Sequence, residues 1–129
     1  LGPEAFCNLA LPRGAGLYLL GDATPLYYTI PVLYNTTWDS WPLADAMRAA
    51  PGDPPAWSRA LLARGVRFVL VNPSEINRLT RSGWADPIIT AESALAWLSA
   101  AARPVKQWPG VALFDLLPSP PESAREPVP

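Results

Sequence analysis

The sequence predicts an α/β fold: a three-layer sandwich of Rossmann-like or flavodoxin-like build, with a mostly parallel sheet and a C-terminal antiparallel hairpin. The segment Val66 to Val71 is almost entirely apolar and lies between Gly65 and Pro73, which is typical of a buried parallel strand. Helix signals flank this segment on both sides. Two short strand-like segments, joined by Pro109-Gly110, follow near the end of the chain.

The other strands are expected at residues 16–22, 30–34, 104–108 and 111–116. Pro109 and Gly110 suit the two central positions of a type II turn. Hairpins seldom use that turn, so a bulge is expected nearby.

Four helices are expected, beginning after Trp41, Asp53, Asn72 and Thr90. Asp53 and Asn72 are each followed by proline, which fits an N-cap and the first helical position. Gly65 is the expected left-handed residue at the end of the second helix. The faces expected to be buried repeat at helical spacing: Leu43, Ala46, Met47 and Ala50; Trp57, Ala60 and Leu61; Ile76 and Leu79; Ala91, Ala94, Leu95, Leu98 and Ala102.

A chain of 129 residues has the length of a single domain. Residues 1–13 are expected to be a lead-in from a preceding part of a longer protein. Residues 14–117 form the predicted single α/β domain. Residues 118–129 are proline-rich and polar, so this tail is expected to be disordered.

Composition excludes several classes of function. Histidine is absent and Cys7 is the only cysteine, so no Ser-His-Asp or Cys-His catalytic centre and no zinc site is expected. The net charge of −1 is spread singly along the chain, which does not indicate a nucleic-acid partner. We therefore predict no catalytic residue, no metal and no cofactor.

Polar residues follow the three predicted parallel strands. Ligands of open α/β sheets bind beyond the carboxyl ends of such strands. Neighbouring strands would bring together Asp22, Asn35, Asp39, Asn72 and Glu75, and paired carboxylates there would suit acid–base chemistry. The alternative is structural, because Asn72 and Glu75 have the spacing of a capping box and Asp39 could cap the next helix.

Aromatic residues lie in and before the polar segment at residues 35–42, which follows the predicted strand at residues 30–34. Tyr28 precedes it, and Trp38 and Trp41 lie within it. Aromatic rings stack on sugar rings, but they also contribute strongly to cores and domain interfaces. Both interpretations stay open at this point.

Two segments carry a family resemblance: GLYLLGDATPLYYTIPVLYNTTWDSWPL at residues 16–43 and ARGVRFVLVNPSEINRLTRSGW at residues 63–84. They resemble the soluble C-terminal domain of bacterial polytopic membrane glycosyltransferases of the protein mannosyltransferase type, which use polyprenyl-phosphate sugar donors. The match spans about residues 6–117. Asp22 stands where a glutamate is expected, and Trp38 where a smaller aromatic residue is expected.

The resemblance implies a non-catalytic, extracytoplasmic accessory domain. Its expected partners are the membrane-embedded part of the same polypeptide and a glycan or a lipid-linked sugar, and an exposed apolar patch should face the membrane-embedded part. The expected ligand-binding residues are Asp22, Tyr28, Asn35, Trp38, Asp39, Asn72 and Glu75. The alternatives are a free-standing flavodoxin-like enzyme or nucleotide-binding domain using Asp22, Asp39 and Glu75, and a sugar-binding module.

Overall fold

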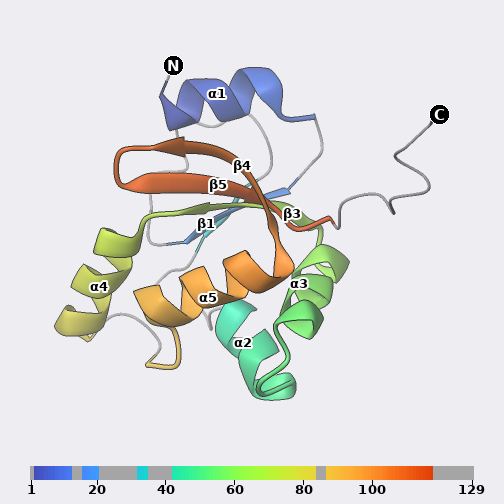
Figure 1. Ribbon diagram of the computed structural model, residues 1–129, viewed down its shortest axis with the longest axis vertical. Helices are drawn as coiled ribbons and strands as arrows, with labels where there is room; N and C mark the ends of the chain where they lie inside the picture. Colours follow the sequence, from blue (N-terminus) through green and yellow to red (C-terminus); the bar gives the residue numbers. More distant parts are fainter. Residues whose placement is uncertain (1, 13–15, 21–31, 35–41, 84–86, 118–129) are drawn as a thin grey trace.

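The computed structural model describes residues 2–12, 16–20, 32–34, 42–83 and 87–117. They contain a five-stranded sheet in the order β2-β1-β3-β5-β4 (Figure 1). The bounds of the strands are β1 Gly16–Leu20, β2 Val32–Tyr34, β3 Val66–Val71, β4 Arg103–Trp108 and β5 Val111–Asp115. Strands β2, β1 and β3 are parallel, and β5 is antiparallel to both of its neighbours, β3 and β4. The predicted mixed α/β fold is confirmed, whereas the Rossmann-like or flavodoxin-like assignment stays a prediction.

Helices cover both faces of this sheet (Figure 1). Of the helices that the structure describes, α1 (Pro3–Ala10) is the one that lies on the first face. The opposite face carries α2 (Pro42–Ala49), α3 (Pro54–Ala63), α4 (Pro73–Ser82) and α5 (Ala91–Ala101). None of the helices described is both long and apolar enough to cross a bilayer.

Strand β1 shows how two cores arise from one sheet. Successive strand residues point to opposite faces. Leu17 and Leu19 accordingly pack with Cys7 of α1, while Tyr18 and Leu20 join the core under the other helices. Strand β3 alternates in the same way from Phe68 to Val71, and it is buried throughout except at Arg67, which is half-buried. The predicted doubly covered central strand is confirmed.

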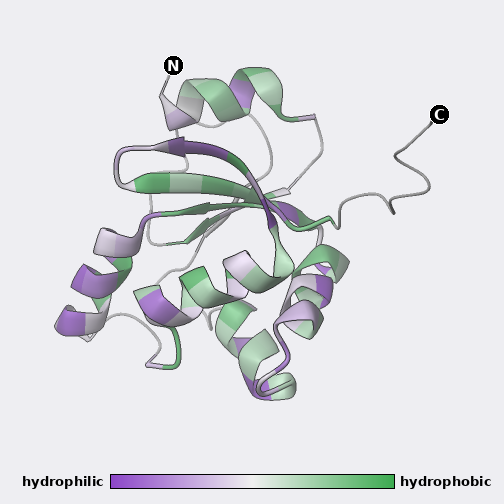
Figure 2. Cartoon of the chain, in the orientation of Figure 1, coloured by the Kyte–Doolittle hydropathy of each residue, from purple (hydrophilic) through white to green (hydrophobic). Residues whose placement is uncertain are grey.

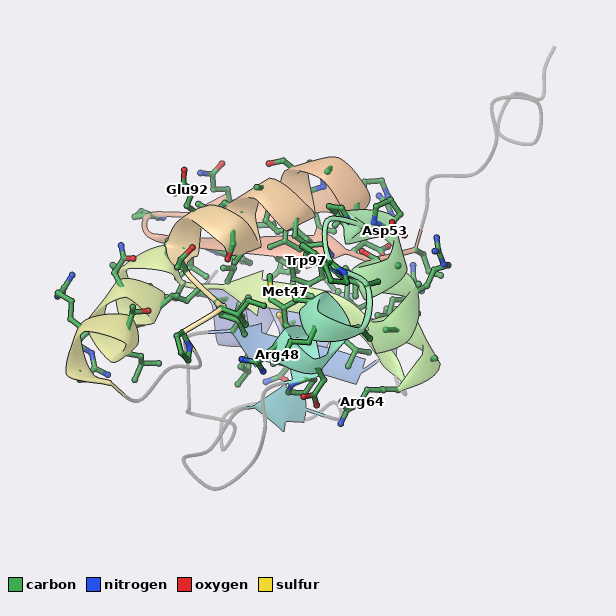
Figure 3. The ribbon with its side chains drawn as sticks, turned by 90° about the horizontal axis from the view of Figure 1, so that it is seen from below. Met47, Arg48, Asp53, Arg64, Glu92 and Trp97 are labelled. Carbon is green, nitrogen blue, oxygen red and sulfur yellow. The ribbon has the colours of Figure 1, made fainter. Side chains whose placement is uncertain are left out.

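Two helices bury most of the predicted face, including Leu61 of α3 and Ala94 and Leu98 of α5, but each differs from the prediction at one position. In α3, Ser58 and Leu61 are buried, whereas Ala60 is exposed. In α5, Trp97 is fully buried and Leu95 is 37% exposed. The spacing rule ranked positions by hydropathy alone, but the larger indole gains more from burial than a leucine does. Met47 and Trp97 lie in the interior between α2 and α5, and Glu92 lies on the outer side of α5 (Figure 3).

The predicted turns and caps largely hold. Asp53 accepts a hydrogen bond from the Ala56 N–H at 3.3 Å, and Gly65 has φ of 88°. Thr90 caps α5 through a reciprocal pair of 2.9 Å bonds with Ser93, a residue that the sequence reading did not single out. Gly110 has φ of 78°, as its place in the predicted turn requires.

Strand β4 forms one edge of the sheet. Its pairing with β5 is irregular between Pro104 and Lys106, at the far end of the strand from the turn, whereas the pairs next to the turn are regular, so the bulge expected near the turn is not found there. The strand is mostly hydrophilic and its partner β5 mostly hydrophobic (Figure 2). Residues 13–15 and 118–129 lie outside the described residues, so the predicted domain boundaries and disordered tail stay predictions.

Candidate functional site

The carboxyl ends of the three parallel strands lie side by side. Leu19 of β1 pairs with Tyr34 of β2, and Leu20 of β1 pairs with Val71 of β3. Beyond the last pair, the Asn72 N–H donates to the Leu20 carbonyl at 3.0 Å. The strand order therefore has the adjacency that the predicted site requires.

Asn72 uses its side chain to begin α4. Its Oδ1 accepts from the Glu75 N–H at 3.2 Å and from the Ser74 hydroxyl at 3.1 Å. In a capping box the Glu75 side chain would also accept a hydrogen bond from the Asn72 N–H. Here that N–H is bonded to the Leu20 carbonyl of β1 instead. The capping interpretation is thus confirmed for Asn72 alone.

Glu75 instead turns along its own helix to Arg78. The Arg78 Nη2 lies 2.7 Å from Glu75 Oε1, and Arg78 Nε donates to the same oxygen at 2.8 Å. The hydrogen bond and the charge of Glu75 raise the pKa of Arg78 above its ordinary value. The Arg78 side chain is 60% exposed and the Glu75 side chain 37%, so this pair lies at the helix surface.

The other predicted site residues, Asp22, Tyr28, Asn35, Trp38 and Asp39, lie outside the described residues. Their convergence with Asn72 and Glu75 stays a prediction. Among the residues that are described, no three His, Cys, Asp or Glu side chains are grouped so as to hold a metal ion.

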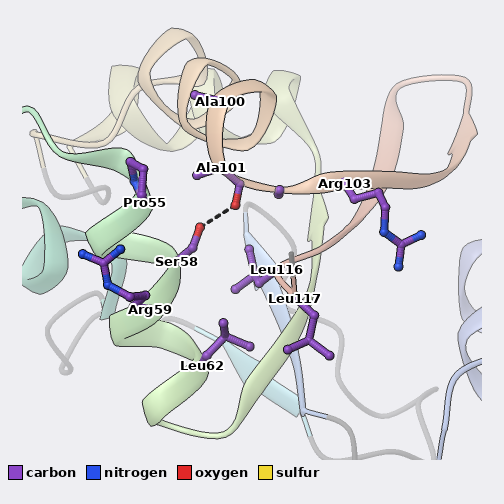
Figure 4. Close-up of a pocket in the computed structure, with 10 residues that line it drawn as sticks. Pro55, Ser58, Arg59, Leu62, Ala100, Ala101, Arg103, Leu116 and Leu117 are labelled. Atoms are coloured by element: carbon purple, nitrogen blue, oxygen red, sulfur yellow. Dashed lines mark hydrogen bonds between the residues drawn. The ribbon is translucent and has the colours of Figure 1, made fainter. Parts of the chain in front are cut away.

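A groove lies at the other end of β3. It is open, has a volume of about 400 Å³, and runs between α3, the C-terminal end of α5 and the end of β5 (Figure 4). Leu116, one of the lining residues, shows that the groove lies near the start of β3, because its N–H donates to the carbonyl of Arg67 at 2.7 Å. The sequence reading looked for a site only at the carboxyl ends and missed this groove. Its lining is formed by Pro55, Ser58, Arg59, Leu62, Ala100, Ala101, Ala102, Arg103, Leu116 and Leu117.

Ser58 joins the two helices that border the groove. Its hydroxyl donates to the Ala101 carbonyl at 2.7 Å and accepts from the Trp97 indole N–H at 2.9 Å. Ser58 is 5% exposed, and Trp97 is fully buried. Buried polar groups need such partners, and a tryptophan on an inward helix face is the signal that could have indicated one.

Asp115 is a buried carboxylate beside the groove, with 1% of its surface exposed. Arg67 binds it with two hydrogen bonds, at 3.2 Å to Oδ1 and 3.0 Å to Oδ2. Arg103 binds Oδ2 at 2.6 Å, and the Leu117 N–H donates to Oδ1 at 3.0 Å. Four donors thus satisfy the carboxylate, and the guanidinium of Arg67 also lies 4.8 Å from the ring centre of Phe68.

The register explains why these charges meet. Asp115 is opposite Phe68 on β3 and Arg103 on β4, and residues directly opposite share a face of the sheet. A local irregularity in β3, next to Val66, lets Arg67 reach the same carboxylate. The position of Asp115, two residues after the buried Leu113 in the same strand, could have indicated a buried carboxylate. Its partners Arg67 and Arg103 could not be predicted in this way, because they are distant in the chain.

No protein-family model matches the sequence, and no curated protein matches it. Among solved structures, it is similar to the C-terminal globular domain of an oligosaccharyltransferase from Archaeoglobus fulgidus, at 14% sequence identity and a TM-score of 0.49. The similarity covers 85% of this chain and 90% of that one.

Proposed function

We propose that this chain is a non-catalytic accessory domain of a membrane-bound glycosyltransferase. In this proposal it packs on the membrane-embedded part of the same polypeptide, at the extracytoplasmic face of the membrane. The resemblance of residues 16–43 and 63–84 to the mannosyltransferase type supports the class of parent enzyme. The outer surface of α5 supports the mode of packing.

The main observation behind the proposal is the apolar outer surface of α5. The exposed residues of α5 include only one charged side chain: Glu92, Leu95, Ala96, Ser99 and Ala100. Ile88, just before the helix, is 36% exposed and Leu95 is 37% exposed. Apart from its first turn, the helix is mostly apolar (Figure 2). Such surfaces commonly mark contact with another protein segment, and we assign this one to the membrane-embedded part.

The two described residues of the predicted ligand site support an accessory role. The Asn72 side chain holds the first turn of α4, and the Glu75 carboxylate is paired with Arg78. Both groups therefore already have structural partners. In the proposal the parent's reaction occurs in its membrane-embedded part, where this domain helps the acceptor or the polyprenyl-phosphate donor to bind.

The proposal is tested by placing a charge on the apolar surface. In membranes containing the full-length polypeptide, Leu95→Arg should lower the rate of sugar transfer, because it puts a guanidinium into the packed interface. Asn77→Arg, on the exposed side of α4, is the matched control and should leave transfer unchanged. Equal transfer by both variants, with the domain equally stable, would contradict the packing. Sugar transfer by the isolated domain would contradict the non-catalytic role.

A second candidate is sugar binding at the carboxyl ends of the parallel strands. The side-by-side ends of β2, β1 and β3 favour it, because Asp22, Tyr28, Asn35, Trp38 and Asp39 all follow these ends in the sequence. Trp38→Ala should then weaken binding of an acceptor glycan measured by calorimetry. Unchanged binding in that variant would argue against a stacking site there.

A further inference from the structure

The groove between α3 and α5 has the dimensions and walls of a small-ligand site. Its volume of about 400 Å³ lies within the range of roughly 300–1,000 Å³ that is usual for such sites. The walls are apolar on three sides: Leu62 from α3, Ala100 from α5, and Leu116 and Leu117 from the end of β5. Leu117 is 40% exposed, so a ligand that covered it would remove apolar surface from water.

The charges on the lining have one sign. Among the residues that the structure describes, the charged ones that line the groove are Arg59 and Arg103, which lie on opposite sides of it, and none is a carboxylate (Figure 4). Arg103 is already bound to Asp115 at 2.6 Å. Within the part of the chain that the structure describes, Arg59 has no ion-pair partner.

The polar groups at the centre of the groove are already satisfied. The Ser58 hydroxyl and the Ala101 carbonyl bond to each other, and the Trp97 indole completes the set. The C-terminal end of α5 also places partial negative charge near Ala101, which disfavours an anion there. The groove therefore favours a ligand with an anionic head group near Arg59 and an apolar body along Leu62, Leu116 and Leu117.

We propose that this groove binds a small amphipathic anion. Its alkyl chain would lie on Leu62, Leu116 and Leu117, and its carboxylate or phosphate would accept hydrogen bonds from the guanidinium of Arg59. A guanidinium suits either group because its N–H donors match two oxygens at once. The groove adjoins the outer surface of α5 at Ala100 and lies at the opposite end of β3 from the carboxyl ends of the parallel strands.

The test uses the whole chain and three probes with the same alkyl chain: octanoate, octyl phosphate and octanol. Calorimetry below the micellar concentration should show tighter binding of the two anions than of the alcohol. The Trp97 indole N–H, which donates to Ser58, should shift in the NMR spectrum as the groove fills. Equal binding of all three probes, or no binding, would overturn the proposal.

Two pairs of variants locate the binding. Arg59→Gln should weaken binding of the anions roughly three- to tenfold, whereas Arg81→Gln, the same change on exposed α4, should not. Ala100→Phe should fill the groove and abolish binding, whereas Ala96→Phe, on the same helix outside the groove, should preserve it. An equal effect within either pair would overturn the assignment. So would binding that occurs only after residues 118–129 are removed, because the tail would then be the natural occupant.

Discussion

Gly16 lies so close to Gly65 that a Cβ atom on Gly16 would overlap the Gly65 carbonyl oxygen. The contact occurs where the pairing of β1 and β3 is irregular, since Gly16 is opposite Val66 but Leu17 is opposite Phe68. Gly65 itself has φ of 88°, the left-handed conformation that ends α3 and turns the chain into β3. The two glycines together set how closely the central parallel strands approach.

Gly16→Ala should therefore destabilise the domain by about 1–3 kcal/mol, because the added methyl group meets backbone that cannot move aside cheaply. Urea unfolding monitored by circular dichroism would measure it. Gly52→Ala is the control: Gly52 has φ of 74° and open space around it, so its cost is conformational only, about 1 kcal/mol. A smaller loss for Gly16→Ala than for Gly52→Ala would refute the close approach.

Ser58→Ala should cost about 1–3 kcal/mol of unfolding free energy. The substitution leaves the buried Trp97 indole without its acceptor and the Ala101 carbonyl without its donor. Ser82→Ala is a suitable comparison, because the Ser82 hydroxyl also bonds a backbone carbonyl but is exposed, and its effect should be within about 0.5 kcal/mol. Adding Trp97→Phe to Ser58→Ala should cost less than the two single changes summed, since they share one bond. Strict additivity would show that the bond is energetically silent.

Asp115→Asn should destabilise the domain by about 2–4 kcal/mol. The carboxylate is buried, and its loss leaves the guanidinium groups of Arg67 and Arg103 without their shared counter-charge. Both arginines reach solvent, with side chains 35% and 47% exposed, which keeps the loss below that of a fully buried pair. Thermal unfolding of the two proteins at equal pH and salt would measure the difference. An unchanged melting temperature would mean that the ion cluster does not contribute to stability.

Asn72→Ala should remove the N-cap of α4 and cost about 1 kcal/mol, whereas Asn72→Asp should keep the cap. Amide hydrogen exchange would localise the effect to the first turn of α4. Glu75→Gln breaks only an exposed pair and should leave the unfolding midpoint unchanged. If Glu75→Gln proved as damaging as Asn72→Ala, the carboxylate would have a role beyond its bond to Arg78.

Much of the secondary structure could be predicted from local sequence signals. The apolar segment at β3, the Asp53 and Asn72 caps, and the glycines at positions 65 and 110 each act through their immediate neighbours, and each is found as expected. The strand order did not follow from such signals, because β1 lies between β2 and β3 through pairings that are distant in the sequence.

The site was less predictable for the same reason. The groove combines α3, α5 and the end of β5, and the Ser58 to Trp97 bond spans 39 positions of the chain. No periodicity encodes such a contact. Helical spacing alone also misplaced Leu95, because choosing between it and Trp97 depends on which side chain fills the space beside α2 and α3.

The irregular, hydrophilic outer strand has a consequence for self-association. Pro104 has no amide hydrogen to offer a neighbouring molecule, and a strand from another copy would also meet the exposed Lys106. Both residues disfavour growth of the sheet from copy to copy at that edge. A complex formed on that side is therefore favoured by contacts between side chains rather than by extension of the backbone hydrogen bonds of β4.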